Sequence, residues 1–319
     1  MSNATSQVRR VVLVSSVKEL ARNIKGFELK ATQGRLSPFT AGAHITVHLE
    51  HDVQRQYSIC NDPRDSSKYQ IAVLKEANGR GASRYLHEAV FPGSTLLISG
   101  PVNHFELVPD AARYVLIAGG IGITPILAMV RELSARRFAN VRLHYCARSA
   151  SDAAFLDVLP EICISEQVAL HFDGGNPRFG LDVRHLLREP EHGTHVYCCG
   201  PVPLMRSVRE AATAWPKDAL HFESFKPSDG EQDGDAFDIV LRRRGTRLTV
   251  PTSKSIVQVM RENGFDVETS CEAGTCGTCK TRYTSGCPIH NDFVLSEQER
   301  NEFVMVCCAR AIGTLELDL

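Results

Sequence analysis

Short apolar runs separated by turn-rich segments fill the first third of the chain. They read "VVLVSSV", "GFELKAT", "HITVHLE", "QYSIC", "YQIAVLK" and "STLLISG", and one short helix fits between about Ser83 and Val90. Many short strands at close spacing are typical of an antiparallel barrel or sandwich. We therefore predict an antiparallel β-barrel domain over residues 1–105.

The pattern changes near residue 113. The stretch "RYVLIAGGIGITPILAMVRELSARR" (113–137) predicts a buried strand, a glycine-rich turn and an amphipathic helix. Further apolar strands follow at "NVRLHYCAR", "QVALHFD" and "THVYCCG", with helical stretches between them. Such alternation indicates a parallel sheet covered by helices. We predict an α/β domain with a parallel sheet over residues 106–226.

A segment rich in Pro, Gly and acidic residues, "KPSDGEQDGDA", begins at Lys226. This composition favours a linker, which we place at residues 227–235. Beyond it, a possible hairpin, "FDIVLRRRGTRLTVP", and a helix, "SIVQVMRENG", precede a cluster of cysteines. The chain is therefore expected to be multidomain, with a last domain over residues 236–319.

Composition narrows the classes of function. The chain has 319 residues, a formal net charge of −1 and 43% hydrophobic residues. This length favours two or three domains, and the balanced charge argues against a protein that coats nucleic acid. No apolar run approaches the roughly 18 residues of a membrane span, and no signal-peptide pattern opens the sequence. We expect a cytoplasmic protein with neither membrane nor nucleic acid as a partner.

The chain has eleven cysteines, three of them in "SCEAGTCGTCK" (270–280). The cytosol keeps thiols reduced, so this number indicates ligands and buried thiols rather than disulfides. The spacing is Cys271-x4-Cys276-x2-Cys279, with a later thiol at Cys307. It matches the plant-type [2Fe–2S] pattern, in which four thiolates converge on one compact cluster. Gly274 and Gly277 can take positive φ, which would let the loop wrap the cluster.

Two alternatives stand beside the iron–sulfur interpretation. A zinc site usually brings paired C-x2-C knuckles, which the x4 step and the single distant cysteine fit poorly. Buried structural thiols are the other alternative. Cys307 and Cys308 are adjacent, so spacing alone leaves the fourth ligand open, and Cys287 is interpreted as a bystander.

Two short segments of the first domain suit a phosphorylated ligand. "RQYS" (55–58) places a cation, an aromatic ring and a hydroxyl on a strand, which is a weak signal alone. In "NGRGASRYL" (78–86), Gly79 and Gly81 precede a helix expected to open at Ser83, and Arg80 adds positive charge. Free N–H groups at a helix N-terminus favour a phosphate. A plain glycine turn with a serine cap is the alternative.

Two further motifs follow strands of the second domain. "AGGIGITP" (118–125) lacks the G-x-G-x-x-G spacing, yet its backbone could approach a pyrophosphate or a nicotinamide ribose. "YCCGP" (197–201) ends another strand at the same edge of the sheet, where open α/β folds bind ligands. Each motif alone is compatible with a structural turn. Their joint order favours a nucleotide site.

Taken in order, these motifs resemble the phthalate dioxygenase reductase family, to which vanillate O-demethylase reductases also belong. The resemblance spans essentially the whole chain. It implies an FMN-binding β-barrel, an NAD-binding α/β domain and a C-terminal α+β ferredoxin-like (β-grasp) domain. The implied function is the reductase component of a Rieske-type oxygenase. Electrons from NADH would pass through FMN and a [2Fe–2S] cluster to the terminal oxygenase. A reductase serving another acceptor, such as a cytochrome P450, is the alternative.

The resemblance also implies roles for individual residues. The flavin would be held by Arg55, Gln56, Tyr57, Ser58, Ala72, Val73, Leu74, Gly79, Arg80, Gly81 and Ser83. The nicotinamide pocket would include Gly119, Gly120, Gly122, Ile123, Thr124, Pro125, Cys199, Gly200 and Pro201. Ser58, Thr124, Cys199 and Phe225 would lie nearest the reacting groups, with Phe225 stacked on the flavin. The family's "MVC" ending selects Cys307 as the fourth cluster ligand.

The choice of nicotinamide nucleotide is expected to be made at the end of the strand "VRLHYCARSASD". A 2′-phosphate is usually recognised there by Arg or Lys, and a ribose hydroxyl by a carboxylate. Arg148 and Ser149 could accept a phosphate, and no carboxylate immediately follows, since Asp152 is the nearest. The resemblance favours NADH, which is our prediction.

Overall fold

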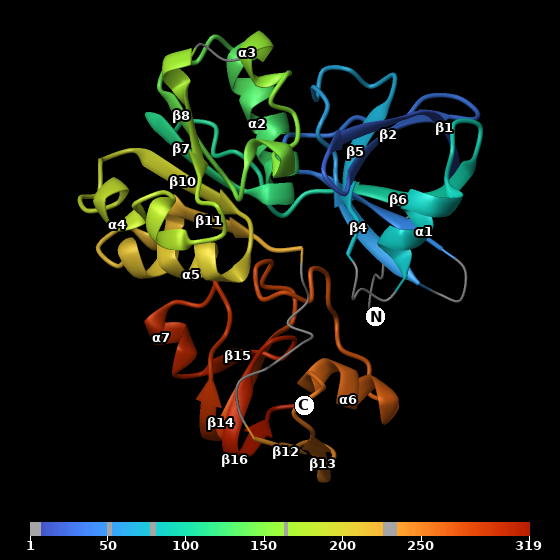
Figure 1. The fold of residues 1–319 in the computed structure, drawn as a ribbon. Coiled ribbons are helices and arrows are strands. Elements are labelled where there is room, and N and C mark those ends of the chain that lie inside the picture. The colour runs from blue at the N-terminus through green and yellow to red at the C-terminus, as the bar shows by residue number, and fades with distance from the viewer. Residues whose placement is uncertain (1–7, 50–52, 77–80, 163–164, 226–234) are drawn as a thin grey trace. The chain divides into compact units, whose positions relative to one another are not determined.

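The computed structural model describes residues 8–49, 53–76, 81–162, 165–225 and 235–319. The chain divides into two compact units, Met1–His221 and Phe222–Leu319 (Figure 1). Within the described residues, no helix is both long and apolar enough to cross a membrane. The predicted linker at residues 227–235 lies almost wholly outside the described residues, and the exact domain boundaries stay predictions.

The first unit opens with a six-stranded sheet in the order β4-β3-β6-β1-β2-β5. Its strands are β1 (Arg10–Ala21), β2 (Ile24–Ala31), β3 (His44–His48), β4 (Gln54–Ser58), β5 (Tyr69–Leu74) and β6 (Thr95–Val102). All the paired strands are antiparallel. The backbone N–H of Cys60, just after β4, donates to Gln70 O of β5 at 2.8 Å, which joins the two ends of the sheet. The predicted antiparallel domain is confirmed.

Alternating apolar side chains fill the inside of this sheet. Phe27, Ile45 and Ile71 are fully buried there, and Leu86 of the helix α1 (Ala82–Ala89) joins the same core. In a strand, successive side chains face opposite sides, so every second apolar residue reaches the core. The short helix predicted near residues 83–90 is present within one residue at each end.

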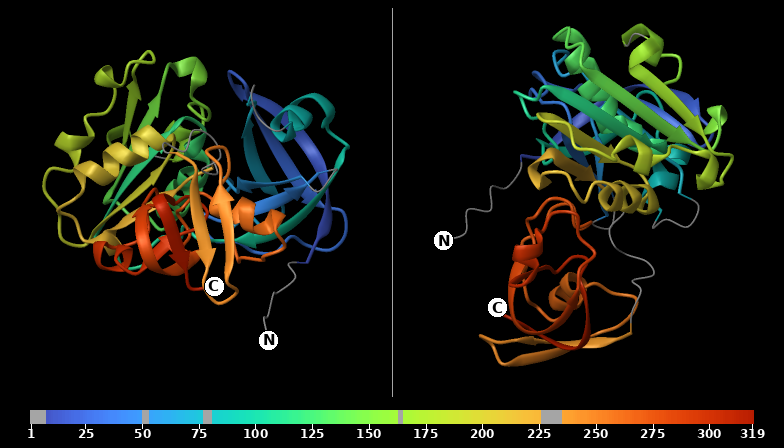
Figure 2. Two further views of the ribbon diagram at one scale, coloured as in Figure 1. Left: turned by 90° about the horizontal axis from the view of Figure 1, so that it is seen from below. Right: turned by 90° about the vertical axis from the view of Figure 1, so that its left-hand side faces the viewer.

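The second sheet of the first unit has the order β11-β10-β7-β8-β9. Its strands are β7 (Arg113–Gly119), β8 (Val141–Ala147), β9 (Val168–Phe172), β10 (Thr194–Cys199) and β11 (Leu220–Glu223). The pairs β10–β7, β7–β8 and β8–β9 are parallel, as predicted. The longer helices α2 (Ile123–Ala135) and α5 (Val202–Ala211) lie on opposite faces of this sheet (Figure 2). The short helices are α3 (Leu159–Ile162) and α4 (Val183–Leu186), with 3₁₀ turns at 120–122, 150–152, 165–167, 177–179 and 217–219.

The two sheets of the first unit share one apolar cluster. Ala72 of β5 and Phe105 belong to it together with Leu116 of β7 and Ile123 of α2. The ring of Phe105 packs edge-on against Tyr197 of β10, with ring centroids 5.4 Å apart. Burial of such apolar surface in one continuous core fixes the two sheets relative to each other.

The second unit has a mixed sheet in the order β13-β12-β16-β14-β15. Its elements are β12 (Phe237–Leu241), β13 (Thr246–Val250), α6 (Ile256–Glu262), β14 (Lys280–Ile289), α7 (Glu297–Arg300), β15 (Phe303–Met305) and β16 (Arg310–Leu317). β12 and β16 are parallel and the other pairs are antiparallel. Ser255 and Ser296 begin α6 and α7 with capping boxes, each satisfying two N–H groups of the first turn. The predicted hairpin, helix and α+β ferredoxin-like class are confirmed.

Candidate functional site

The glycine motif of the second domain lies at the carboxyl end of β7. This strand is apolar and buried except at its first residue, and the chain leaves it through the 3₁₀ turn Gly120–Gly122 into α2. The Thr124 hydroxyl donates to Ile121 O at 3.0 Å and is almost fully buried. Thr124 therefore holds the turn, while the backbone of the glycines forms its surface. Pro125 is the third residue of α2, where its missing N–H costs no hydrogen bond.

The two predicted nucleotide motifs meet at this turn. A Cβ on Gly122 would stand 2.2 Å from Cys199 O, and one on Gly119 would stand 2.7 Å from Pro201 Cδ. The motifs can approach this closely because neither glycine has a side chain. β7 lies between β8 and β10, so the order of the sheet reverses here, and open α/β sheets bind ligands at such a point. Gly119–Pro125 and Cys199–Pro201 are thus brought together.

The predicted flavin residues lie on two strands of the antiparallel domain. On β4, Ser58 is buried and Gln56 is exposed, while the guanidinium of Arg55 donates to Gln54 O at 2.7 Å. Burial raises the pKa of Tyr57 to about 12 against the opposing effect of Arg55, so its hydroxyl stays protonated near neutral pH. Successive side chains of a strand face opposite sides, so Arg55 and Tyr57 share one face of β4 and the buried Ser58 lies on the other.

β5 carries the other half of the predicted flavin site. Ala72 and Val73 are buried and Leu74 is partly buried. β5 lies against the 3₁₀ turn Gly120–Gly122 of the neighbouring domain. The strand expected beside the isoalloxazine therefore borders the turn expected beside the nicotinamide, as hydride transfer requires.

The predicted phosphate loop is only partly described. Gly79 and Arg80 lie outside the described residues. Gly81 has φ 94° and precedes α1 without a side-chain cap, and Ser83 Oγ accepts a hydrogen bond from Glu76 N at 3.1 Å. The serine thus links the end of β5 to the helix. Its role toward a phosphate stays a prediction.

The four cysteines predicted as cluster ligands contact one another in pairs. A hydrogen bond with Cys276 raises the pKa of the Cys271 thiol, and a hydrogen bond with Cys307 raises the pKa of the Cys279 thiol. Among the described residues, no group of three or more His, Cys, Asp or Glu side chains is placed to hold a metal ion. Two thiol pairs suit a binuclear cluster, in which each iron takes two of the four thiolates, better than one zinc ion. The donor set therefore fits a [2Fe–2S] cluster.

The loop that carries these thiols packs on residues that sequence reasoning did not single out. Gly274 has φ 73°, and a Cβ there would stand 2.7 Å from Cys308 Sγ and 3.1 Å from Asp292 Cα. Its carbonyl accepts from Phe293 N at 2.9 Å. Cys308 is buried below this point, and its thiol donates to Met305 O at 3.6 Å. Cys308 therefore supports the loop, while Cys307 pairs with Cys279.

The end of β8 differs from the sequence-based picture. Arg148 is exposed, as a phosphate-binding side chain would be. However, the 3₁₀ turn Ala150–Asp152 folds back, and Ser149 Oγ donates to Asp152 Oδ2 at 2.5 Å. The nearest carboxylate thus reaches the serine despite lying three residues further on. Asp152 is a candidate for nucleotide selection that the sequence analysis did not single out. The short polar segment after Arg148, which can form one tight turn, was the feature that could have indicated it.

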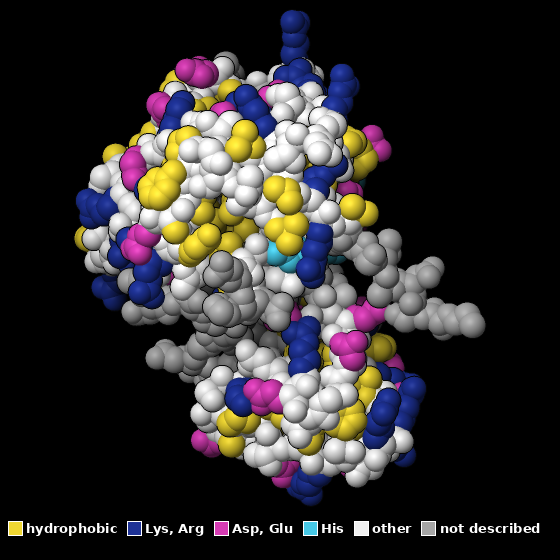
Figure 3. Space-filling view, turned by 90° about the vertical axis from the view of Figure 1, so that its right-hand side faces the viewer, with side chains coloured by type: hydrophobic (Ala, Val, Ile, Leu, Met, Phe, Trp, Pro, Cys, Tyr) yellow, Lys and Arg dark blue, Asp and Glu magenta, His cyan; other side chains and the backbone are white. Residues whose placement is uncertain are grey.

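Phe225 is 38% exposed and directly precedes residues 226–234, which are not described. It falls in the second unit, so its stacking on the flavin stays a prediction. Figure 3 shows Lys and Arg scattered among Asp and Glu over the first unit, in agreement with the balanced net charge.

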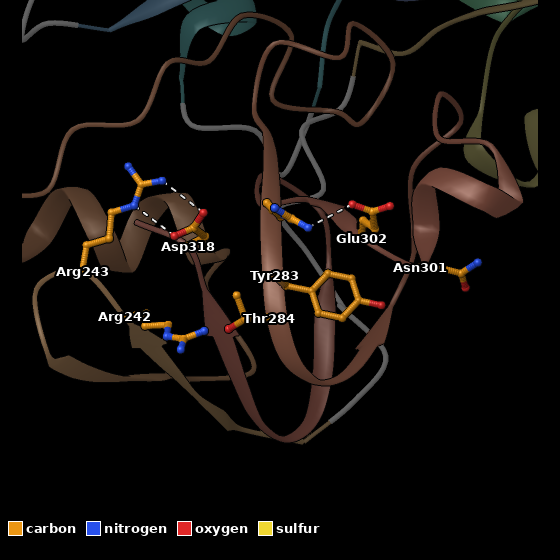
Figure 4. A pocket seen from close by; sticks show the side chains of 8 residues that line it. Arg242, Arg243, Tyr283, Thr284, Asn301, Glu302 and Asp318 are labelled. Carbon is orange, nitrogen blue, oxygen red and sulfur yellow. Dashed lines mark hydrogen bonds and ion pairs between the residues drawn. The ribbon is translucent and has the colours of Figure 1, made fainter.

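The second unit also has an open groove of about 700 Å³ (Figure 4). It is lined by Arg242, Arg243, Arg282, Tyr283, Thr284, Asn301, Glu302 and Asp318. The Arg243 guanidinium donates twice to Asp318, at 2.9 and 3.0 Å, and Arg282 lies 3.3 Å from Glu302. None of these eight residues belongs to the predicted sites.

An antiparallel domain with the predicted flavin residues, a parallel sheet whose strand order reverses at a glycine turn and a plant-type cysteine loop define an NAD(P)H-dependent oxidoreductase with a flavin and a [2Fe–2S] cluster. Three family models match: an oxidoreductase FAD-binding domain over residues 11–107, an oxidoreductase NAD-binding domain over 116–210 and a 2Fe-2S iron-sulfur cluster binding domain over 239–311.

Full-length relatives place the chain more closely. It is 46% identical to the tert-butanol monooxygenase / tert-amyl alcohol desaturase reductase subunit of Aquincola tertiaricarbonis, over 90% of this chain and 88% of that one. The solved phthalate dioxygenase reductase is 38% identical, with a TM-score of 0.72 over 99% of this chain and 98% of that one. An intact type IV self-sufficient cytochrome P450 monooxygenase is also 38% identical, with a TM-score of 0.73 over 98% of this chain but 41% of that one.

The chain belongs to the phthalate dioxygenase reductase family. The function predicted from its motifs is confirmed at the level of this family: a reductase component of Rieske-type oxygenases that transfers electrons from NAD(P)H through a flavin and a [2Fe–2S] cluster.

Proposed function

We propose that this protein uses NADH and FMN and reduces a terminal Rieske-type oxygenase. The observation that carries the proposal is the contact of β5 with the turn Gly120–Gly122, which borders the Cys199–Pro201 turn. A bound flavin would supply the conversion of a two-electron hydride into single electrons for the cluster. The protein aligns the carriers.

The residues of the chain serve this alignment. The glycine backbone at the end of β7 positions the nicotinamide, with the turn held by Thr124. Ser58 is buried at the end of β4 and would offer its hydroxyl to the flavin, and the Cys199–Pro201 backbone would border the nicotinamide. Phe225 would stack on the flavin. Cys271, Cys276, Cys279 and Cys307 would hold the cluster. None of the ten described cysteines forms a disulfide, in keeping with the proposed cytoplasmic location.

FMN is favoured over FAD by the short path from ring strand to phosphate loop. β5 ends at Leu74 and α1 begins at Ala82, and Ser83 ties the two together through Glu76 N. Heat release of the cofactor followed by chromatography tests the choice. An FMN peak is expected, and an FAD peak would refute it.

A visible spectrum before and after anaerobic NADH tests the electron path. Flavin and [2Fe–2S] bands are expected to bleach together. Flavin bleaching alone would show that the cluster is absent or isolated. Steady-state assays with each donor should show a higher kcat/KM for NADH, and a higher value for NADPH would overturn the donor proposal.

A haem acceptor is the second candidate. It is favoured by the resemblance of the whole chain to part of a self-sufficient cytochrome P450 monooxygenase. Stopped-flow reduction of a purified Rieske oxygenase and of a purified P450, each by the NADH-reduced protein, separates the two. Faster reduction of the P450 would make a haem protein the favoured electron acceptor.

A further inference from the structure

A polar network joins the first domain to the end of β8. Arg22, in the turn between β1 and β2, donates from its backbone N–H to Ser151 O and from its guanidinium to Ser151 Oγ, both at 2.8 Å. Its Nε lies 3.6 Å from Asp152 Oδ1. Together with the 2.5 Å bond from Ser149, these contacts hold the Asp152 carboxylate from two sides.

The position of the Asp152 carboxylate suggests a role in ligand binding in addition to the ion pair. β8 is the second strand of the nucleotide domain and neighbours β7, whose glycine turn forms the crevice. In dinucleotide-binding sheets, an acid after the second strand binds the ribose hydroxyls of the adenosine half. The Asp152 side chain is 27% exposed, so solvent still reaches it despite these contacts.

We propose that Asp152 determines the choice between a ribose 2′-hydroxyl and a 2′-phosphate, and that Arg22 of the flavin domain is its positioning residue. The carboxylate accepts a hydrogen bond from the hydroxyl and repels the phosphate dianion. The Arg22 guanidinium donates to Ser151 Oγ and lies 3.6 Å from Asp152 Oδ1, so the carboxylate offsets part of its positive charge. The inference deepens the proposed use of NADH and rests on it for the direction of selection.

The primary test is Asp152→Asn in the full-length holoprotein, which keeps the size and removes the charge. The ratio of kcat/KM for NADPH to that for NADH should rise about tenfold to hundredfold, the range expected for one charge-assisted hydrogen bond and its repulsion. In binding assays with the unreactive ligands ADP and 2′,5′-ADP, affinity for 2′,5′-ADP should rise relative to ADP. Asp152→Glu should keep the wild-type ratios.

The controls use a similar ion pair elsewhere. Arg64 and Asp62 form an exposed pair with a shortest distance of 2.6 Å within the flavin domain. Asp62→Asn should leave both ratios unchanged. If Asp152→Asn also leaves them unchanged, Asp152 is only a structural partner of Arg22 and the inference is overturned.

Arg22 is tested separately. Arg22→Ala should raise the KM for NADH while kcat stays near the wild-type value, and Arg22→Lys should restore part of the loss. An equal fall in kcat in both variants, with no change in the KM for NADH, would overturn the positioning role. The proposed use of NADH fails on a different result, namely a preference of the wild-type protein for NADPH. The role of Asp152 is judged only by the change that Asp152→Asn causes relative to the wild-type protein.

Discussion

The turns at the edge of the parallel sheet are built from backbone, whereas the cysteine loop of the second unit relies on side chains. At the sheet edge, Gly122 lies so close to Cys199 O that no Cβ fits between them. In the cysteine loop, four thiols meet in two pairs, and Gly274 leaves room for Cys308 below. The first site is framed by strands on both sides, while residues 263–279 of the loop contain no helix or strand.

This difference predicts how each site fails. A backbone site tolerates changes of side chain but not added volume, because added atoms must push its closely packed turns apart, which costs free energy. A ligand site tolerates changes around it but not the loss of one donor, because every iron coordination position must be filled. The following experiments test that contrast.

The largest effect is expected for the cluster ligands. Replacing any one of Cys271, Cys276, Cys279 or Cys307 with Ser should abolish the [2Fe–2S] absorbance and the electron paramagnetic resonance signal of the reduced protein. Flavin content and flavin reduction by NADH should remain. Cys287, which is exposed on β14, provides the matched control, and Cys287→Ser should keep the cluster. Loss of the cluster in Cys308→Ser, with retention in Cys307→Ser, would contradict our fourth ligand.

The backbone site is tested by Gly122→Ala. Its Cβ would overlap Cys199 O at 2.2 Å, so the two turns must separate, at a cost of about 3 kcal/mol. Urea unfolding followed by flavin fluorescence measures the loss. Gly120→Ala is the control, because its Cβ meets open space and only the positive φ of 53° costs about 1 kcal/mol. Equal losses in the two variants would refute the steric explanation.

Acid should weaken the sheets of the first unit through buried histidines. Burial, assisted by nearby His104, lowers the pKa of His44 on β3 to about 4. The unfolded chain, with a pKa near 6.5, binds the proton first, so this stability is present above about pH 6.5 and is lost as the pH falls toward 4. Between pH 7 and 5 the loss should be about 1 to 2 kcal/mol. Urea midpoints at the two pH values measure it, and His44→Gln should show a shallower dependence; identical slopes would exclude His44 as the cause.

The smallest effect is expected at Thr124. Thr124→Val keeps the shape and removes the bond to Ile121 O, which should cost about 1 kcal/mol. Because the hydroxyl holds the turn, the KM for NADH should rise more than kcat falls. A fall in kcat alone, seen in stopped-flow flavin reduction, would instead assign the hydroxyl a direct part in hydride transfer.

The sequence was sufficient where local pattern determines structure. The apolar runs predicted the strands of the first sheet, β7 to β10 of the second sheet and the β12–β13 hairpin of the third, but not β11, β14, β15 or β16. The positions of the cysteines predicted a common loop. These features depend on alternation and spacing, which are visible in one dimension. The β12–β13 hairpin and α6 were found for the same reason, with turn or capping residues at their ends.

Contacts between distant segments could not be predicted in this way. Spacing alone left Cys307 and Cys308 equivalent and the family resemblance favoured Cys307. The packing of Cys308 under Gly274, which spacing could not predict, supports that choice. Asp152 was set aside because it lies three residues beyond Ser149, whereas a 3₁₀ turn brings it back. Arg22 is more than 120 residues away from Ser151, and no local signal connects the two.

The apolar cluster shared by the two sheets of the first unit limits how such chains can be divided and recombined. A cut near residue 105 would strip Phe105 from Tyr197 and expose Ala72 on one fragment and Leu116 on the other. A cut between residues 226 and 234 leaves that cluster whole. The exchangeable module is therefore the flavin and nucleotide domains together, and an engineered fusion that keeps them joined should accept a different terminal electron carrier more readily than one that swaps either domain alone.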